Sequence, residues 1–179
     1  MIDNETLRNA LQGLKPFAGE YVVMDSDGRE VARVHNFLTY AGVDILTGVI
    51  AQQITPATWK VGLLSGSVSK DDTEEIHAWT EPVESEGYAR QACTVQEVVR
   101  TTTSQQTVTA LIFSPVTFTC GAENTDWSKA YTNLFMSMTD SQEPTPHTEI
   151  ISIGSQLPSP VRLFKGGAYT TAYRLYFRA

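Results

Sequence analysis

The stretch Thr107-Val-Thr-Ala-Leu-Ile-Phe113, followed by Ser114-Pro115 and then Val116-Thr-Phe-Thr-Cys120, decides the expected fold of this chain. In the first run the side chains alternate with a period of two, which is typical of a half-buried strand. Ser114-Pro115 is a turn signal, and the second run is again rich in β-branched and aromatic residues. The stretch therefore predicts two short strands joined by a turn.

The same pattern recurs on both sides of this stretch. Further strands are predicted at Trp59–Leu64, Tyr88–Val95, Ala130–Met138, Glu149–Ile153 and Tyr169–Phe177. Turn residues separate them, and we find no internal repeat. Short strands at regular spacing favour a β-sandwich or jelly-roll-like fold over βαβ units. We expect a mainly β protein.

Glu20–Val34 is the clearest hairpin, because two apolar runs flank Asp25-Ser-Asp-Gly28, whose residues tolerate the turn backbone. Asp-x-Asp-Gly is also the beginning of a calcium-binding loop. An EF-hand loop, however, needs Gly at its sixth position and Glu at its twelfth, where this chain has Glu30 and Asn36. Turn chemistry therefore explains the string.

One long helix is expected over residues 38–53, packed on the sheets, with Asn36 as its cap. The apolar and small residues that share its face at the helical period are Leu38, Ala41, Gly42, Ile45, Leu46 and Val49. We expect Gly42 and Gly48 to allow a close approach to a strand, since glycine is otherwise unfavourable in a helix by about 1 kcal/mol. The β-rich domain is thus predicted to span residues 20–179, with the hairpin at 20–34, this helix and strands from 58 onward.

Residues 1–19 are predicted to form an N-terminal arm that contains a short amphipathic helix. Leu7, Leu11 and Leu14 fall on one face of it. A helix of about ten residues is marginal by itself and needs a surface to pack on. Two interpretations stay open: the arm packs on its own domain, or it docks on another subunit through Leu7, Leu11, Leu14 and Phe17.

The composition limits the classes of function. The 179 residues fit a single core, and only 18% are charged, against about 25% in an average soluble protein. Thirteen Lys and Arg against 20 Asp and Glu give a net charge of −7, which argues against binding to nucleic acid phosphates. No apolar stretch approaches the roughly 20 residues of a membrane span, and no secretory signal is present. We therefore expect synthesis in a cytoplasm, with neither nucleic acid nor membrane as partner.

No motif in the sequence predicts catalysis, a metal or a cofactor. A Gly-x-Ser-x-Gly elbow and a P-loop are both missing, and the three histidines lie in separate segments. A carboxylate pair for glycoside cleavage, drawn from Glu81, Glu84, Glu86 and Asp126, stays open because such pairs meet only in the folded chain. The prediction is that the protein is not an enzyme and holds no metal and no cofactor.

Cys93 and Cys120 are the only cysteines, and no C-x-x-C spacing exists. Both are predicted to be buried free thiols, with a disulfide between neighbouring strands as the alternative. Ser65–Glu86, which precedes both cysteines in the chain, is polar and acidic. We interpret this segment as a long surface excursion that carries Trp79.

Three segments resemble a group of small virion proteins of tailed bacteriophages. They are Asn36-Phe-Leu-Thr-Tyr-Ala-Gly42, Trp59-Lys-Val-Gly-Leu-Leu64 and Gly87-Tyr-Ala-Arg-Gln91. Asp126-Trp127 sits where that group has an aromatic-led strand, and the order and rough spacing agree from about residue 36 to 179. The resemblance covers most of the chain through short motifs, and it carries over no catalytic residue.

The resemblance implies a non-enzymatic virion structural protein, either tail- or tail-fibre-associated or a capsid decoration (cement) protein. Its partners would be other virion proteins, namely capsid, tail or fibre subunits, and it would be a homo-oligomer or present in many copies per particle. It would be assembled in the host cytoplasm and located in the virion. The alternative is a carbohydrate- or receptor-binding module of a phage appendage, with a host-surface glycan stacked on exposed aromatic rings of Trp79, Tyr88 and Trp127. Core packing is the other interpretation of each of these rings.

Overall fold

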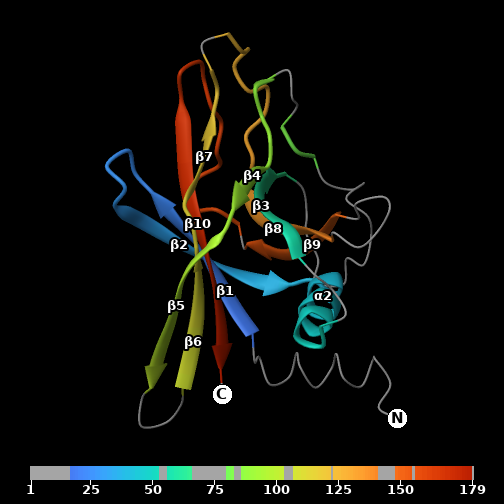
Figure 1. Cartoon of the computed structure of the whole chain (residues 1–179). Helices are drawn as coiled ribbons and strands as arrows, with labels where there is room; N and C mark the ends of the chain where they lie inside the picture. Colours follow the sequence, from blue (N-terminus) through green and yellow to red (C-terminus); the bar gives the residue numbers. More distant parts are fainter. Residues whose placement is uncertain are drawn as a thin grey trace.

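The structure, a computed structural model, describes residues 17–52, 56–65, 80–82, 86–102, 107–121, 123–140, 148–154 and 156–178. Strands make up most of these residues (Figure 1). In chain order the elements are β1 Phe17–Met24, β2 Glu30–Leu38, α2 Tyr40–Ile50, β3 Pro56–Leu64, β4 Gln91–Cys93, β5 Val95–Thr102, β6 Thr107–Phe113, β7 Val116–Thr119, β8 Asn133–Asp140, β9 Thr148–Gly154 and β10 Ala168–Arg178.

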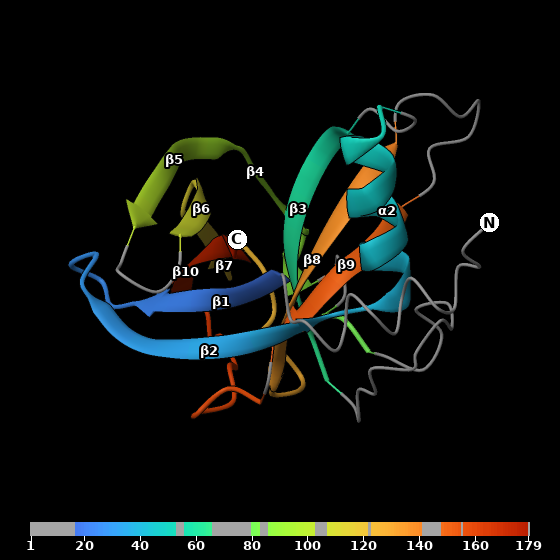
Figure 2. The same ribbon diagram turned by 90° about the horizontal axis from the view of Figure 1, so that it is seen from below.

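The strands form one bent sheet that returns on itself. Their order is β4-β3-β8-β9-β2-β1-β10-β6-β5, with β7 paired to β10, and every pairing is antiparallel. The two ends of this order, β4 and β5, are separated in the chain only by Thr94. Seen from below, the strands therefore surround a common interior, with β4–β5 on one side and the curved β2 on the other (Figure 2).

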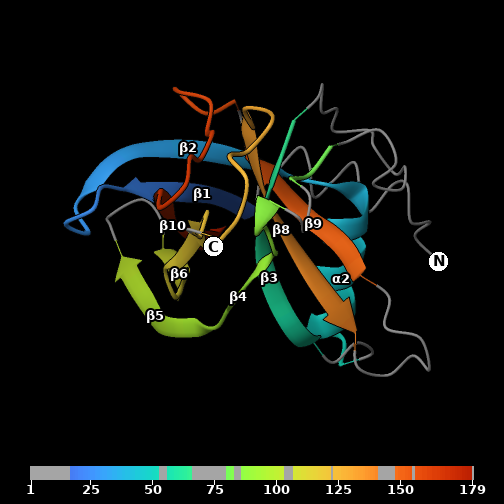
Figure 3. The same ribbon diagram turned by 90° about the horizontal axis from the view of Figure 1, so that it is seen from above.

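The sheet bends within strand β2. Its residues 30–35 pair with β1, and Asn36, Phe37 and Leu38 pair with β9. The view from above shows β2 running from the wall that contains β1 to the wall that contains β9 (Figure 3). The jelly-roll-like sandwich expected from the sequence is thus corrected: the two walls are continuous through β2 and are not independent layers.

The predicted hairpin at 20–34 is confirmed as β1 and β2. The Asp25 carboxylate accepts hydrogen bonds from the N–H groups of Asp27 (2.9 Å) and Arg29 (2.8 Å). Gly28 has φ of 75°, a value that glycine adopts without strain. The Asp25-Ser-Asp-Gly28 string thus makes the tight turn that its residue types predict.

The prediction of a long helix over 38–53 is wrong. The helix, α2, spans only the 11 residues Tyr40–Ile50, because Leu38 still pairs with Ser152 as part of β2. Thr39, and not Asn36, is its cap, and the Thr39 hydroxyl accepts a hydrogen bond from Gly42 N at 2.9 Å. In the described part of the chain no helix is long and apolar enough to cross a membrane.

The predicted N-terminal helix lies outside the described residues, as do Leu7, Leu11 and Leu14. The first described residue, Phe17, already belongs to β1 and pairs with Phe177 of β10. Strand β1 therefore starts three residues before the predicted boundary at residue 20.

Large aromatic and aliphatic side chains fill the interior of the bent sheet. Tyr21 and Tyr173 contact each other on neighbouring strands, with ring centroids 4.8 Å apart. The largest side chains that are fully buried are Trp127, Tyr21, Tyr131, Tyr173, Phe113, Phe118, Phe135, Leu63, Leu64, Leu134 and Met136. Strand β8 contributes consecutive residues to this set, so both of its faces are covered. Helix α2 lies against β9, on the outer side of the wall that contains β8 and β9 (Figure 2).

Candidate functional site

Two of the three predicted glycan-binding aromatics are buried. Trp127 is 0% exposed and Tyr88 is 6% exposed, and their rings meet edge to face with centroids 6.0 Å apart. The prediction that these rings are exposed is therefore wrong for both residues, because neither presents a face to a ligand in solution. Trp79 lies outside the described residues.

Trp127 is held from several sides. Its indole N–H donates to the carbonyl of Glu86 at 3.1 Å, and its ring meets Tyr131 edge to face at 5.6 Å. The Arg162 Nε donates to the Trp127 carbonyl at 2.7 Å. A buried indole with its N–H satisfied is what core packing of tryptophan requires. Trp127 therefore anchors the loop before β8 in the interior.

Tyr88 and Arg90 lie in Gly87-Tyr-Ala-Arg-Gln91, one of the three segments quoted for the expected phage resemblance. Together with Glu81 they form a polar cluster, which we call the clasp. The Tyr88 hydroxyl accepts from Leu63 N at 3.0 Å and donates to the Glu81 carboxylate at 2.9 Å. Arg90 pairs with the same carboxylate at 2.6 Å, and its guanidinium lies over the ring of Phe135, 4.9 Å from the centroid. Burial, followed by the nearby Glu81 charge, raises the pKa of Tyr88 well above its ordinary value. The clasp thus fastens the segment before β4 to β3 and β8.

Gly62, in a second segment that carries the resemblance, is required by this packing. A Cβ at this position would lie 2.3 Å from the ring of Phe135 and 2.8 Å from the Tyr88 hydroxyl. Gly62 and Phe135 are direct partners across β3 and β8. Only glycine lets the ring lie against the backbone of β3, so this segment also has a structural role.

Three of the four carboxylates considered for catalysis make contacts within the fold. Glu81 is in the clasp, Asp126 accepts from Lys165 N at 2.9 Å, and Glu86 accepts from Ser128 N at 2.8 Å. The other Glu86 oxygen is buried without a hydrogen bond. Glu84 lies outside the described residues. Among the residues that are described, no three His, Cys, Asp or Glu side chains gather into a group that could hold a metal ion.

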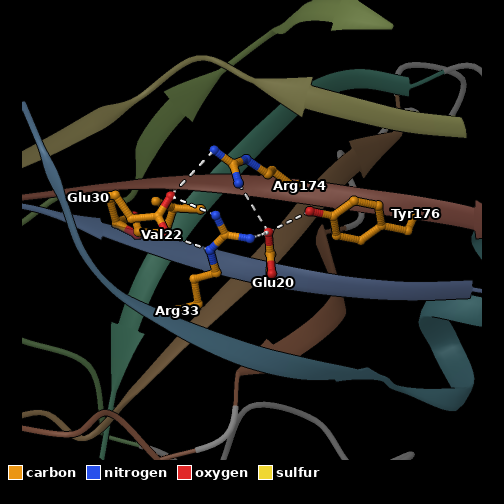
Figure 4. A network of polar contacts seen from close by, with 7 residues as sticks. Glu20, Val22, Glu30, Arg33, Arg174 and Tyr176 are labelled. Carbon is orange, nitrogen blue, oxygen red and sulfur yellow. Dashed lines mark hydrogen bonds and ion pairs between the residues drawn. The ribbon is translucent and has the colours of Figure 1, made fainter. Parts of the chain in front are cut away.

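A network of ionic side chains that the sequence did not reveal covers the middle of β1, β2 and β10 (Figure 4). The Glu20 side chain is 6% exposed and pairs with Arg174 at 3.1 Å and with Arg33 at 3.5 Å. It also accepts a short hydrogen bond from the Tyr176 hydroxyl. Because each charge has an opposite partner, the network joins three strands and leaves no isolated buried charge.

Glu30 also belongs to this network. Its carboxylate accepts hydrogen bonds from Arg33 and lies 3.8 Å from Arg174. The hydrogen bond from Arg33 is the main reason that the pKa of Glu30 is lowered. The two arginines therefore bridge Glu20 and Glu30, which come from neighbouring strands.

Cys93 and Cys120 are both free and buried, as predicted. Burial raises the pKa of the Cys93 thiol to about 12. A thiol that is neutral at ordinary pH is a poor nucleophile. Cys93 and Cys120 both belong to the hydrophobic core cluster.

The surface feature that stands apart is the outer edge of β5. Strand β5 pairs with β6 on one side, and no described strand pairs with it on the other. Its side chains are exposed along almost its whole length, including Val98 at 62% and Val95 at 42%. The other large apolar side chains exposed in the described residues are Val31 (59%) and Phe164 (56%), which lie on separate elements.

The row of residues that ends at Val98 runs out of the core. Val98 lies directly opposite Leu111 on β6, which lies directly opposite Leu175 on β10. Leu175 is 1% exposed, Leu111 is partly buried, and Val98 is 62% exposed. Residues paired in this way share a face of the sheet. An apolar row of the interior therefore reaches the edge of β5, where Val98 is exposed.

Comparisons with known proteins return no relative. No family model, no curated protein and no solved structure matches the chain.

Sequence reasoning missed β5 because its signal is weak. Val95-Gln-Glu-Val-Val-Arg-Thr-Thr102 does not alternate apolar and polar residues, and the prediction placed a strand over Tyr88–Val95 instead. In the structure Tyr88 precedes the first strand of this region, and β4 is only Gln91–Cys93. The high content of β-branched residues was the one available sign of β5.

Proposed function

We propose that this chain is a non-enzymatic structural subunit of a tailed-bacteriophage particle, tail- or fibre-associated or of the capsid decoration type. The resemblance of three segments to small virion proteins supports this proposal. A subunit of that kind works by binding its neighbours, so its surface must offer a docking site. We take the free edge of β5 as that site.

The observation that carries the proposal is the exposure of an eight-residue edge strand. Its backbone edge lacks a described partner, and Val95 and Val98 are exposed along it. An edge strand of this length is a template on which another polypeptide pairs. Backbone pairing gives affinity, and the apolar side chains add buried area.

The N-terminal arm supplies a second contact in this proposal. Phe17 begins β1 and pairs with Phe177, which in turn lies opposite Thr109 of β6 and, beyond it, Arg100 of β5. The arm therefore meets the domain at one end of a cross-strand row whose other end is Arg100 of β5, three strands away. Its residues Leu7, Leu11 and Leu14 would pack on a neighbouring subunit.

The glycan-binding alternative has weaker support. Its residues Tyr88 and Trp127 are buried within the interior, and stacking on a sugar needs an accessible ring face. We therefore propose docking between proteins and not the recognition of a carbohydrate.

A test of the proposal is the location of the chain. A tagged chain produced together with the particle genes that accompany it should co-sediment with assembled particles and be labelled on them in electron micrographs. Recovery of the tagged chain only in the particle-free fraction contradicts the proposal. Because β1 begins at Phe17, deletion of residues 1–16 tests the arm while it leaves every described strand in place. Unchanged incorporation after this deletion shows that the arm does not dock.

A further inference from the structure

We infer that the partner of the β5 edge is the β5 edge of a second copy of this chain, paired antiparallel about a two-fold axis through Val98. The inference rests on the proposed function in taking β5 as the docking site, and it goes further by naming the partner. Three observations carry it: the unprotected edge, the apolar row that reaches it, and the positions of its charges.

Strand β5 lacks three of the devices that keep an edge strand from pairing, although it carries the charged residues Glu97 and Arg100. Edge strands are usually short or carry lysine or proline. The other end of the strand order, β4, is three residues long, whereas β5 has eight residues and neither lysine nor proline. A bulge interrupts its pairing with β6 only at its beginning, between Val95 and Glu97. From Glu97 to Thr101, no described strand pairs with the outer edge of β5.

A second copy provides the cover that the apolar row requires. The row Leu175, Leu111, Val98 ends at an exposed valine. If Val98 lies opposite Val98 of the partner subunit, the same row continues through the partner in reverse order. Identical surfaces related by a two-fold axis are self-complementary in this way. The core then becomes continuous across the interface.

The charges of β5 select the register. Two-fold antiparallel pairing places one residue opposite its own copy, and the longest overlap of an eight-residue strand centres on Val98 or Val99. A shift to Glu97 or to Arg100 would bring like charges directly opposite, which destabilises a sheet. Of the two central registers, only the one through Val98 joins the most exposed valine to itself. Arg100 then lies opposite Gln96 of the other copy.

The net charge of the strand also permits self-pairing. The whole chain carries −7, so most surfaces of two copies repel each other. Strand β5 has one glutamate and one arginine and is neutral. Two copies can therefore approach along this edge without a local electrostatic penalty.

The test of the register is a cysteine cross-link on the full chain. Directly opposite residues have Cβ atoms about 4.5–5.5 Å apart, close to the separation that a disulfide spans. Val98→Cys should therefore give a covalent dimer under mild oxidation, faster than Val99→Cys or Val31→Cys. Val31 is the matched control, because it is a similarly exposed strand valine. The natural cysteines are buried, so the unsubstituted chain should not cross-link.

A charge substitution tests the interface without a covalent bond. In light scattering across a concentration series, the natural chain should reach the mass of a dimer. Val98→Lys places two ammonium groups opposite each other and should raise the dissociation constant about tenfold or more. Val31→Lys should change it less than about twofold. A circular dichroism melt of each variant identifies any loss of fold.

Defined outcomes overturn the inference. It is wrong if the natural chain stays a monomer at every concentration, or if Val98→Cys cross-links no faster than Val31→Cys. Faster cross-linking of Val99→Cys overturns the register. A Val98→Lys monomer that still enters particles overturns self-pairing while the proposed function stands. If Val98→Cys forms a cross-linked dimer but the chain never enters particles, self-pairing stands and the proposed function is overturned.

Discussion

Strands β8 and β5 have the same length, eight residues, and belong to the same antiparallel sheet, yet their surroundings are opposite. In β8, Leu134, Phe135 and Met136 are all fully buried, so both faces of the strand are covered. In β5, seven of the eight side chains are exposed and the eighth is partly buried. The comparison teaches that, under the proposed function, stability and surface recognition depend on different strands. Substitutions in β8 and around it should affect unfolding, and substitutions in β5 should affect association.

The largest effect is expected at Phe135. Phe135→Ala removes a fully buried ring that packs on Gly62 and under Arg90, and it should lower the free energy of unfolding by about 3–5 kcal/mol. Chemical denaturation measures this loss. Phe164→Ala is the matched control, since Phe164 is 56% exposed and should cost about 0.5 kcal/mol. Equal losses at the two positions would break the comparison.

A smaller loss is expected from adding one methyl group at the close contact of β3 with β8. Gly62→Ala places a Cβ 2.3 Å from the Phe135 ring, and it should destabilise the protein by about 1–3 kcal/mol. The double variant Gly62→Ala with Phe135→Leu should lose less than the two single variants added together, because the smaller side chain makes room. Strictly additive losses in denaturation curves would show that the contact is not the cause.

The partly buried Tyr169 should make the fold sensitive to alkali. Burial raises the pKa of Tyr169 above its ordinary value of about 10. The unfolded chain then loses its proton first, so the stability is intact below pH 10 and falls as pH rises above it, by up to about 1.4 kcal/mol per pH unit for each such group. Tyr169→Phe should make this fall less steep without altering its sign. An unchanged slope between the two proteins would contradict the assignment.

The smallest effect on unfolding is expected in β5. Val98→Ala removes an exposed side chain and should change the unfolding free energy of the dilute protein by about 0.5 kcal/mol or less. The same substitution should weaken association measured at high concentration, because it shortens the apolar row. A loss comparable to that of Phe135→Ala would show that β5 is part of the core.

Local signals in the sequence were sufficient for some elements. Asp25 and Gly28 carry all the chemistry of their turn, so the hairpin of β1 and β2 could be predicted within a few residues. The alternation along β10 was similarly visible. The burial of Cys93 and Cys120 followed from the apolar segments that contain them.

The remaining features depend on contacts between distant residues. Leu38 satisfies the helical period as well as that of a strand, and only its pairing with β9 decides that it belongs to β2. Glu20 meets Tyr176 across 156 residues, which no local pattern indicates. Tyr88 is in a polar context in the sequence, and its burial depends on β3 lying beneath it.

The pairing of β1 with β10 has a consequence for synthesis. Every residue of β1 has its partner on a strand that emerges from the ribosome roughly 150 residues later, a delay of about 8–30 s at ordinary translation rates of about 5–20 residues per second. During this interval the nascent chain can form the hairpin of β1 and β2 but cannot close the sheet. Folds dominated by such distant pairings also fold slowly after release, in milliseconds to seconds. Newly made chains therefore pass through a stage in which β1 offers a temporary open edge, and slower translation lengthens this stage.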